Sequence, residues 1–455
     1  MSIDTVAAPQ RQADLIYGLT DRPPLRQTIF VALQHVLAVF VGIITPPLII
    51  ARALKLPAAD SAFLVSMALF ISGIGTLIQT HRLGPIGSGL LSIQGTSFVF
   101  LGPIIALATA AMAQGASQQQ ALGIVFGVCL ATSLVPMLIS PFLKLSGRII
   151  PPLVTGTVVT LIGLTLIQVG ITSVGGGFEA KAAGTFGSIE NLCLAALVVC
   201  VILVLNGSGK PGLRMISVVI GLAIGYAVAV ALGRTDLTSL HGMAWITVPT
   251  PFRFGLGFRA TALIPFSFLY VITAIESIGD LTATSSLTDQ PLTGPLYLQR
   301  LRGGVLADGI SSALAALFNS FPSTTFAQNN GIIQLTGVGS SYIGTFVGAM
   351  LIILGLFPAV GGLVQAMPQS ILGGATIIMF GTVAAAGIRI LSSIDLDRRA
   401  STIIAVSIGL GLGVTFVPEI MNGMPPIIKD TFSSGIATGG ICALILNAVM
   451  PGRRV

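Results

Sequence analysis

Residues 321–341 read Phe-Pro-Ser-Thr-Thr-Phe-Ala-Gln-Asn-Asn-Gly-Ile-Ile-Gln-Leu-Thr-Gly-Val-Gly-Ser-Ser, a polar run among membrane-length apolar segments. Amides are costly in hydrocarbon, so these side chains must face protein, water or a ligand. The β-prone Thr-Thr-Phe after Pro322 predicts an extended piece over residues 324–328, and the apolar pattern predicts a helix from Gly331. Where an extended piece meets a helix N-terminus in mid-membrane, unpaired backbone N–H groups point into a cavity. This arrangement is typical of transporter substrate sites.

The composition of the whole chain indicates a polytopic membrane protein. Of 455 residues, 53% are hydrophobic and only 8% are charged, and the mean hydropathy is +0.96. A soluble domain of this length would expose far more charge. The net charge of +7 fits basic cytoplasmic loops and requires no nucleic-acid partner. We find no metal-ligand spacing and no nucleophile–base pair in the sequence, so we expect a transporter without a cofactor or metal, not an enzyme.

We predict an all-α fold with fourteen membrane-spanning segments. Their approximate ranges are 28–50, 62–80, 88–110, 121–140, 152–172, 191–206, 214–232, 260–285, 303–319, 323–341, 343–364, 371–388, 401–418 and 433–450. With cytoplasmic termini, this layout leaves few of the 22 basic residues outside: Arg52, Lys55, Lys181, Arg234, Arg253, Arg259 and Lys429. The excess on the inside has the sign expected for a membrane protein.

Fourteen spans divide into two inverted repeats of seven, and the contents of the two halves match. The third span is interrupted by polar residues over Ser92–Phe98, as the tenth is at Gln328–Gly331. Polar residues also match between the first and eighth spans: Gln34 and His35 in one, Glu276 and Asp280 in the other. Interrupted spans at matching positions predict a midplane substrate site built from short extended strands and half-helices.

Three motifs resemble those of the nucleobase–ascorbate transporter family (nucleobase–cation symporter 2), with the bacterial xanthine and urate permeases looking closest. They are Gln34-His35-Val36-Leu37-Ala38, then Glu276-Ser277-Ile278-Gly279-Asp280, then Gln328-Asn329-Asn330-Gly331 with Thr336-Gly337 after four residues. The similarity runs from about Asp21 to the last span. Their order along the chain makes the resemblance specific.

The resemblance implies a core domain that holds the site, a gate domain, and a homodimer that associates through the gate domains. We expect a loosely ordered cytoplasmic tail over residues 1–26, core segments over 27–145 and 256–367, and gate segments over 146–255 and 368–455. The expected location is the inner membrane.

Glu276 is the strongest candidate for a functional residue because it lies in a span, directly after a mostly apolar run. The family's matching glutamate contacts the purine ring, and a carboxyl group here could also carry the coupling proton. A purely structural ion pair is less favoured, since no Lys or Arg lies in the same or matching spans. Asp280 shares its helix face, and Asp308 is a third buried acid. For both of these, a structural role and a role in proton movement stay equally open.

Gln328 offers one acceptor and two donors in a plane, which suits the edge of an oxopurine, and the resemblance assigns its counterpart to substrate binding. Asn329 is expected to brace the loop or tune specificity, and Gly331 to shape the turn at the site. On the opposing wall we expect backbone and hydroxyl groups from Gln94, Gly95 and Thr96.

Aromatic and histidine side chains are further candidates. Phe98 or Phe100 could stack on the purine, and so could Phe266 or Tyr270, although aromatic residues in spans more often belong to the core. His35 could relay protons, touch the ligand or act as a hydrogen-bonded brace, and we favour the brace.

These features together predict a proton-coupled symporter that imports oxopurines (xanthine, urate or both) by alternating access. The alternatives are a carrier of uracil or another nucleobase, a uniporter or channel, and an anion exchanger of similar architecture. A uniporter needs no titrating acid, and an anion exchanger would be expected to place a basic residue near the half-helices. Val99 stands where the xanthine permeases have a polar residue, which leaves the choice between xanthine and urate open. The choice between H⁺ and Na⁺ as the coupling ion is also open.

Overall fold

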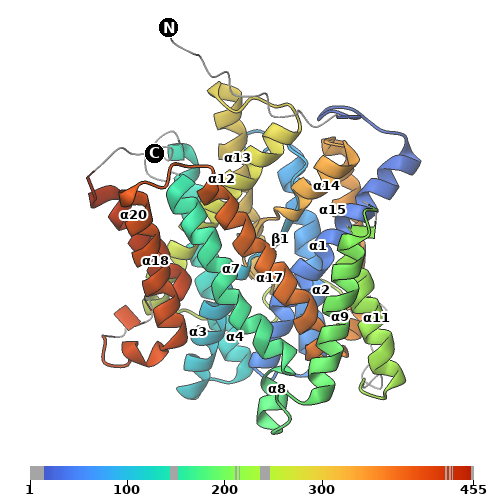
Figure 1. The fold of residues 1–455 in the computed structure, drawn as a ribbon, viewed down its shortest axis with the longest axis vertical. Helices are drawn as coiled ribbons and strands as arrows, with labels where there is room; N and C mark the ends of the chain where they lie inside the picture. The colour runs from blue at the N-terminus through green and yellow to red at the C-terminus, as the bar shows by residue number, and fades with distance from the viewer. Residues whose placement is uncertain are drawn as a thin grey trace.

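The computed structural model describes residues 15–143, 152–210, 213–214, 216–235, 246–425, 428–429, 432 and 434–451, and its fold is almost entirely helical (Figure 1). The first half contains α1 (Leu25–Ala53), α2 (Ala58–Thr80), β1 (Gln94–Thr96), η1 (Phe98–Phe100), α3 (Leu101–Ala113), α4 (Gln118–Thr132), α5 (Leu134–Ile139), η2 (Ser140–Phe142), α7 (Pro152–Val174), α8 (Gly177–Ala182), α9 (Ile189–Gly207) and α11 (Ser217–Ala231). The second half contains η4 (Ala260–Ala262), α12 (Leu263–Leu287), α13 (Gly294–Leu317), β2 (Ser323–Thr325), α14 (Gln328–Thr336), α15 (Ser341–Leu356), α16 (Pro358–Gln365), α17 (Gln369–Ser392), α18 (Arg398–Phe416), η5 (Pro418–Met421) and α20 (Gly435–Val449). The η elements are single 3-10 turns.

The long apolar helices make the chain a multi-pass membrane protein. Within the described ranges, eight helices are long and apolar enough to cross a membrane, or nine if the bent pair α15 and α16, with 74° between them, forms one span. Shorter apolar helices cover Phe98–Ala113, Ser217–Ala231 and Gly435–Val449. Helical structure is found at every predicted span, but length and composition do not establish fourteen crossings, so that number stays a prediction.

Two helices, α7 and α17, run side by side in front of the centre of the molecule and pack along each other (Figure 1). A Cβ atom at Gly163 would lie 2.3 Å from the backbone nitrogen of Ala384, and one at Gly387 would lie 2.3 Å from that of Thr160. Glycine on both helices therefore permits a backbone approach that any side chain would block. Helices α9 and α11 lie on one side of this pair, and α18 and α20 on the other.

A second group of helices surrounds the two strands. Helix α2 packs against α1, α13 and α15, while β1 contacts α1 and α2, and β2 contacts α12 and α13. The strands pair antiparallel with Gly95 opposite Thr324, Gln94 opposite Thr325 and Thr96 opposite Ser323. The three residues of each strand pair with those of the other where the two interrupted segments cross. Irregular backbone at membrane depth requires its polar groups to be satisfied within the protein in this way.

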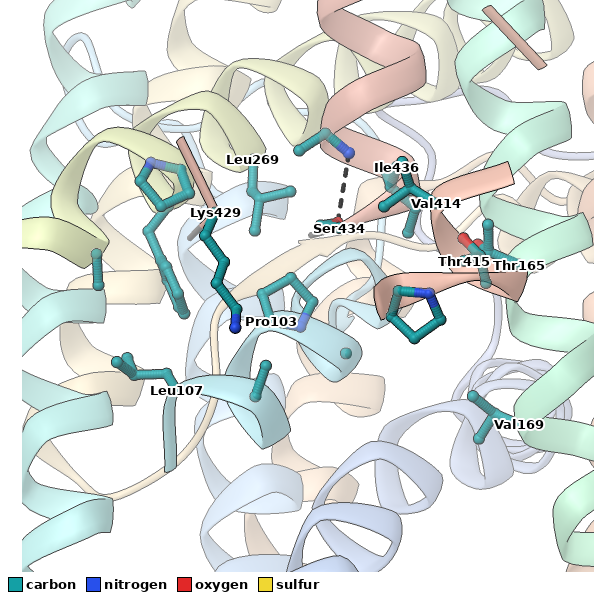
Figure 2. A pocket seen from close by; sticks show the side chains of 18 of the residues that line it. Pro103, Leu107, Thr165, Val169, Leu269, Val414, Thr415, Lys429, Ser434 and Ile436 are labelled. Carbon is teal, nitrogen blue, oxygen red and sulfur yellow. Dashed lines mark hydrogen bonds between the residues drawn. The ribbon is translucent and has the colours of Figure 1, made fainter. Parts of the chain in front are cut away.

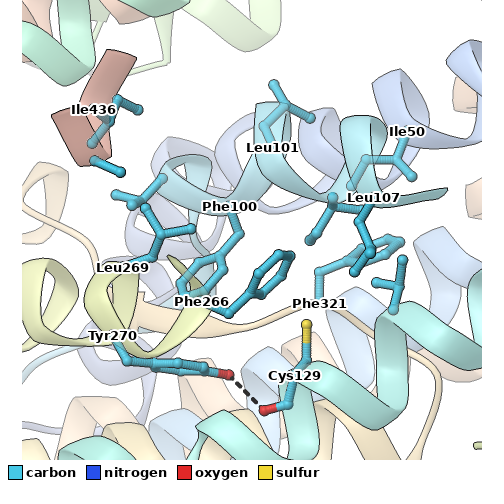
Figure 3. Close-up of a cluster of buried hydrophobic side chains, with 14 of the residues drawn as sticks. Ile50, Phe100, Leu101, Leu107, Cys129, Phe266, Leu269, Tyr270, Phe321 and Ile436 are labelled. Carbon is cyan, nitrogen blue, oxygen red and sulfur yellow. Dashed lines mark hydrogen bonds between the residues drawn. The ribbon is translucent and has the colours of Figure 1, made fainter. Parts of the chain in front are cut away.

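Several aromatic candidates belong to the hydrophobic core (Figure 3). The ring centroid of Phe100 lies 4.7 Å from that of Tyr270 and 5.9 Å from that of Phe266. The hydroxyl of Tyr270 donates to the carbonyl oxygen of Cys129 at 3.2 Å. All three rings are at most 2% exposed. This burial favours the core role that aromatic residues in spans usually have, and stacking of these rings on a substrate stays a prediction.

The chain before α1 is attached to the end of α14. The backbone nitrogens of Ile16 and Tyr17 donate to the carbonyl oxygen of Gly337 at 2.8 and 3.1 Å, and Gly339 donates to Tyr17 at 2.9 Å. The nitrogen of Ser341 donates to Leu19 at 3.0 Å. The expectation of a loose tail is wrong for residues 16–19, whose backbone forms bonds that sequence alone did not reveal.

The junction between β2 and α14 also differs from its prediction. The extended piece is shorter than residues 324–328, and the helix begins at Gln328, three residues before Gly331. The nitrogens of Asn329 and Asn330 donate to Phe326 and Ala327 at 3.1 and 3.0 Å, which closes the first turn early. Asparagine normally competes with a helix backbone, but here its amides bind neighbouring elements instead.

Candidate functional site

Strands β1 and β2 bring the two interrupted segments together. The backbone nitrogen of Gln94 donates to Thr76 on α2 at 3.0 Å, which fixes the position of β1. A Cβ atom on Gly95 would lie 2.5 Å from the ring of Phe326, which also lies against Gly42 of α1. The absence of a side chain at Gly95 therefore lets this ring sit over the strand crossing.

Asp308 of α13 is fully engaged by its neighbours. Its Oδ1 accepts a hydrogen bond from Nε2 of Gln94 at 2.5 Å, and its Oδ2 accepts one from the hydroxyl of Ser277. The residue is only 3% exposed. The predicted substrate contact Gln94 thus gives one of its two amide hydrogens to an acid, and its Oε1 has no hydrogen-bond partner among the described residues.

Hydroxyl groups connect Asp308 to Asp280. The Oγ1 of Thr325 lies 3.3 Å from Oγ of Ser277 and donates to Oδ2 of Asp280 at 3.0 Å. Thr324 lies 3.2 Å from the same serine oxygen. The result is a continuous polar path from α13 through α12 and β2, made of groups that can both donate and accept.

Glu276 has a different environment. Its side chain is half-buried, and its Oε2 has no hydrogen-bond partner among the described residues. It lies near enough to Asp280 and Asp308 for their charges to interact. The three acids therefore form one electrostatically coupled cluster.

Helix α14 is held by its asparagines. The amide of Asn329 donates to the carbonyl of Leu91 at 2.5 Å. Oδ1 of Asn330 accepts from the hydroxyl of Thr284 at 2.6 Å, and its amide donates to the carbonyl oxygen of Asp280 at 3.4 Å. These bonds tie the N-terminal turn of α14 to the segment before β1 and to α12.

Gln328 and Gly331 lie on the less occupied part of α14. Gln328 is half-buried and Gly331 is exposed. No described atom lies within 4 Å of the place where a Cβ of Gly331 would be, and the same holds for Gly279 of α12. There is consequently free space beside both helices, on the elements that carry Glu276 and Gln328.

The remaining predicted residues occupy the edge of this arrangement. Thr96 is buried in β1. Phe98 is half-buried, and its ring centroid lies 5.2 Å from that of Phe380 on α17, edge to face. His35 is fully buried close to Asn329, yet neither ring nitrogen has a hydrogen-bond partner within the described part of the chain. Its role as a brace therefore stays a prediction.

Ser277, Thr325 and Phe326 are the residues that our sequence reasoning missed. Ser277 follows Glu276 directly, and Thr325 lies in the β-prone segment, so hydroxyls next to predicted site elements were the available signal. Their partners come from other elements and could not be paired from sequence. Within the described ranges, no group of three or more His, Cys, Asp or Glu side chains is arranged to hold a metal ion.

Comparison with known proteins identifies the family. The sequence profile Xan_ur_permease, described as a permease family, matches residues 26–420. The chain belongs to this family. The resemblance to nucleobase–ascorbate transporters is thereby confirmed, and this permease is a transporter rather than an enzyme.

Named relatives agree with this membership, and a solved structure shares the fold. The permease is 50% identical over 459 residues to "Xanthine permease XanP" of Escherichia coli (strain K12), covering 99% of each chain. It is 37% identical over 420 residues to "Uric acid permease PucJ" of Bacillus subtilis (strain 168), covering 91% of each. Its fold is similar to the transmembrane domain of a cyanobacterial bicarbonate transporter, BicA, with a TM-score of 0.62, 16% identity, and coverage of 91% of this chain and 99% of that one.

Proposed function

We propose that this permease is a proton-coupled symporter that imports oxopurines, xanthine or urate or both, across the inner membrane. The observation that carries the proposal is that α12, which bears the half-buried acid Glu276, contacts the half-helix α14, which begins at Gln328, beside free space. Relatives named as xanthine and uric acid permeases support the substrate class.

Each group at the site has a role in this proposal. Glu276 accepts hydrogen bonds from purine ring N–H groups, and Gln328 donates to a carbonyl oxygen and accepts from an N–H. Phe98 stacks on the ring, and the backbone of Gly95 and Thr96 forms the opposing wall. Asn329 and Gly331 set the position and shape of the half-helix.

The coupling proton moves among the three acids. Glu276 takes up a proton with the substrate, and the path from Asp280 through Thr325 and Ser277 to Asp308 redistributes charge as the protein changes conformation. His35 supports the half-helix from α1. A half-buried acid that forms no ion pair with a described residue is the arrangement expected of an intramembrane proton carrier.

The proposed architecture has two inverted repeats of seven spans. The antiparallel pairing of β1 with β2, and the side-by-side packing of α7 with α17, are what such repeats would produce, since each pair occupies matching positions. Residues 27–145 and 256–367 would form the core domain, and 146–255 and 368–455 the gate domain. Alternating access would move core against gate, both termini would be cytoplasmic, and gate domains would join two copies in a homodimer.

The fold itself raises a second candidate, because an anion transporter shares it. Among the described residues, the charged side chains gathered at the strand crossing are Glu276, Asp280 and Asp308, all acids. Such a cluster repels small inorganic anions, whereas a purine offers N–H groups to a carboxylate. Uracil offers the same hydrogen-bonding groups to a carboxylate, and competition experiments distinguish it from the oxopurines.

Uptake of radiolabelled xanthine, urate and uracil into cells that express the permease tests the proposal. We expect accumulation of xanthine or urate that a protonophore abolishes and that omission of Na⁺ leaves unchanged. Oxopurine uptake indifferent to the protonophore would reject proton coupling. Uracil competing as well as xanthine against the labelled substrate would reject the oxopurine assignment.

A further inference from the structure

A cavity of about 360 Å³ lies between the predicted core and gate domains (Figure 2). Pro103 and Leu107 of α3 and Leu269 of α12 line it from the core side. Thr165 of α7 and Ile436 of α20 line it from the gate side. Its size falls in the range of about 300–1,000 Å³ that is typical of small-molecule sites.

The cavity adjoins the candidate site through Phe98. This residue lines the cavity, lies two positions after β1, and packs edge to face on Phe380. A ligand that leaves the cavity toward the strand crossing would therefore pass the ring of Phe98. The neighbouring wall at Gly102 has no described atom within 4 Å of a would-be Cβ, so the cavity is open beside α3.

The charged lining residues of the cavity are both basic. Arg259 is half-buried, and its Nε donates to the hydroxyl of Thr261 at 3.3 Å. Nζ of Lys429 donates to Oδ1 of Asn422 at 2.9 Å. Among the described lining residues there is no Asp or Glu, and Glu419, next to the lining residue Pro418, is exposed. Both cations lie on the side predicted to face the periplasm.

We propose that this cavity is an outer vestibule that binds the anionic form of the oxopurine before it reaches Glu276 and Gln328. The inference rests on the proposed function. Urate is largely anionic at neutral pH, and a cleft with one sign of charge and low-dielectric walls concentrates ligands of the opposite sign. The apolar walls suit a flat ring, while the acid-rich site deeper inside gives the anion no comparable attraction.

The test is the kinetics of radiolabelled urate uptake in cells that express Arg259→Gln, Lys429→Gln or both. We expect the apparent KM for urate to rise roughly three- to tenfold in Arg259→Gln, and further in the double variant, with Vmax changed less than about twofold. Raising the ionic strength should increase the apparent KM of the wild type for urate toward that of the variant, since salt screens electrostatic attraction. Arg259→Lys should restore most of the loss.

A matched control is Arg234→Gln, which removes an exposed cation that pairs with Glu190 and does not line the cavity. It should leave the KM for urate unchanged, and membrane levels of every variant should match the wild type. The vestibule proposal would be rejected if the KM for urate were unchanged in Arg259→Gln or rose equally in Arg234→Gln. Oxopurine uptake by the wild type would still support the proposed function. A wild type that takes up no oxopurine would overturn both.

A steric variant tests the vestibule without relying on charge. Thr165→Trp places a large ring in the cavity from α7 and should lower urate uptake by about tenfold or more. The purified variant should still bind xanthine, which shows that it is folded. Normal uptake by Thr165→Trp would show that the substrate does not pass through this space.

Discussion

The two halves of the candidate site differ in how completely their polar groups are satisfied. In the closed half, Asp308 bonds to Gln94 and Ser277, and Gly95 lies under Phe326. In the open half, Glu276 keeps an unpartnered oxygen, and Gln328 and Gly331 are partly accessible. The difference teaches that similar acids in one polar cluster need not share a role. The closed half holds the strand crossing together, and in the proposed function the open half binds the ligand and the proton.

Glu276→Gln breaks the open half and has the largest expected effect. The change keeps the shape but removes the charge and the exchangeable proton, so accumulation of xanthine against its gradient should be lost altogether. Uptake into energised cells measures this, and equilibrium binding to purified protein separates binding from coupling. Glu190→Gln, an exposed carboxylate outside the site, is the control and should accumulate xanthine normally. Retained accumulation in Glu276→Gln would place the coupling acid elsewhere.

Asp308→Asn tests the closed half. An amide can still bond to Gln94 and Ser277 but cannot carry the negative charge, so we expect Vmax to fall about tenfold or more while KM changes less than about threefold. Initial rates of xanthine uptake over a range of concentrations give both values. If the KM for xanthine rises as much as Vmax falls, the distinction between the two halves is wrong.

Gln328→Glu sharpens the comparison on the ligand side. A second carboxylate near Glu276 would repel anionic urate and partly anionic xanthine, and a mismatched buried hydrogen bond costs about 1–3 kcal/mol. We expect a loss of roughly tenfold or more in affinity for both purines. Gln334→Glu, at an exposed position of the same helix, is the matched control and should change affinity little. Equal losses in the two variants would point to a general effect on α14.

Gly95→Ala and Gly331→Ala compare the two halves by stability. The new methyl group at residue 95 would lie 2.5 Å from the Phe326 ring, which is also confined by Gly42, so overpacking should cost about 1–3 kcal/mol. At residue 331 no described atom lies within 4 Å, and alanine in a helix should be neutral or stabilising. Thermal unfolding of the purified variants measures both, and Phe326→Leu should restore part of the loss in Gly95→Ala. Equal thermal stability of the two variants would contradict the closed packing at the strand crossing.

Much of the candidate site could be predicted from the sequence, because each of its main groups breaks a local rule. A glutamate after a long apolar run, and amides inside a span, are conspicuous in a membrane protein. The boundary of α14 was placed three residues late, since asparagine in isolation disfavours helix. Only the bonds of Asn329 to Leu91 and Asn330 to Thr284 show why the helix begins earlier.

The sequence by itself determined the class of the protein, the positions of the apolar segments and the family motifs, because hydropathy and motif spacing are local properties of the chain. Tertiary structure alone decided which acid is satisfied and which is not. Asp308 meets Gln94 across 214 positions, and Phe98 meets Phe380 across the predicted domain boundary. Such partners depend on how the interrupted segments cross, and hydrogen bonds between distant elements leave no periodic trace in a single chain.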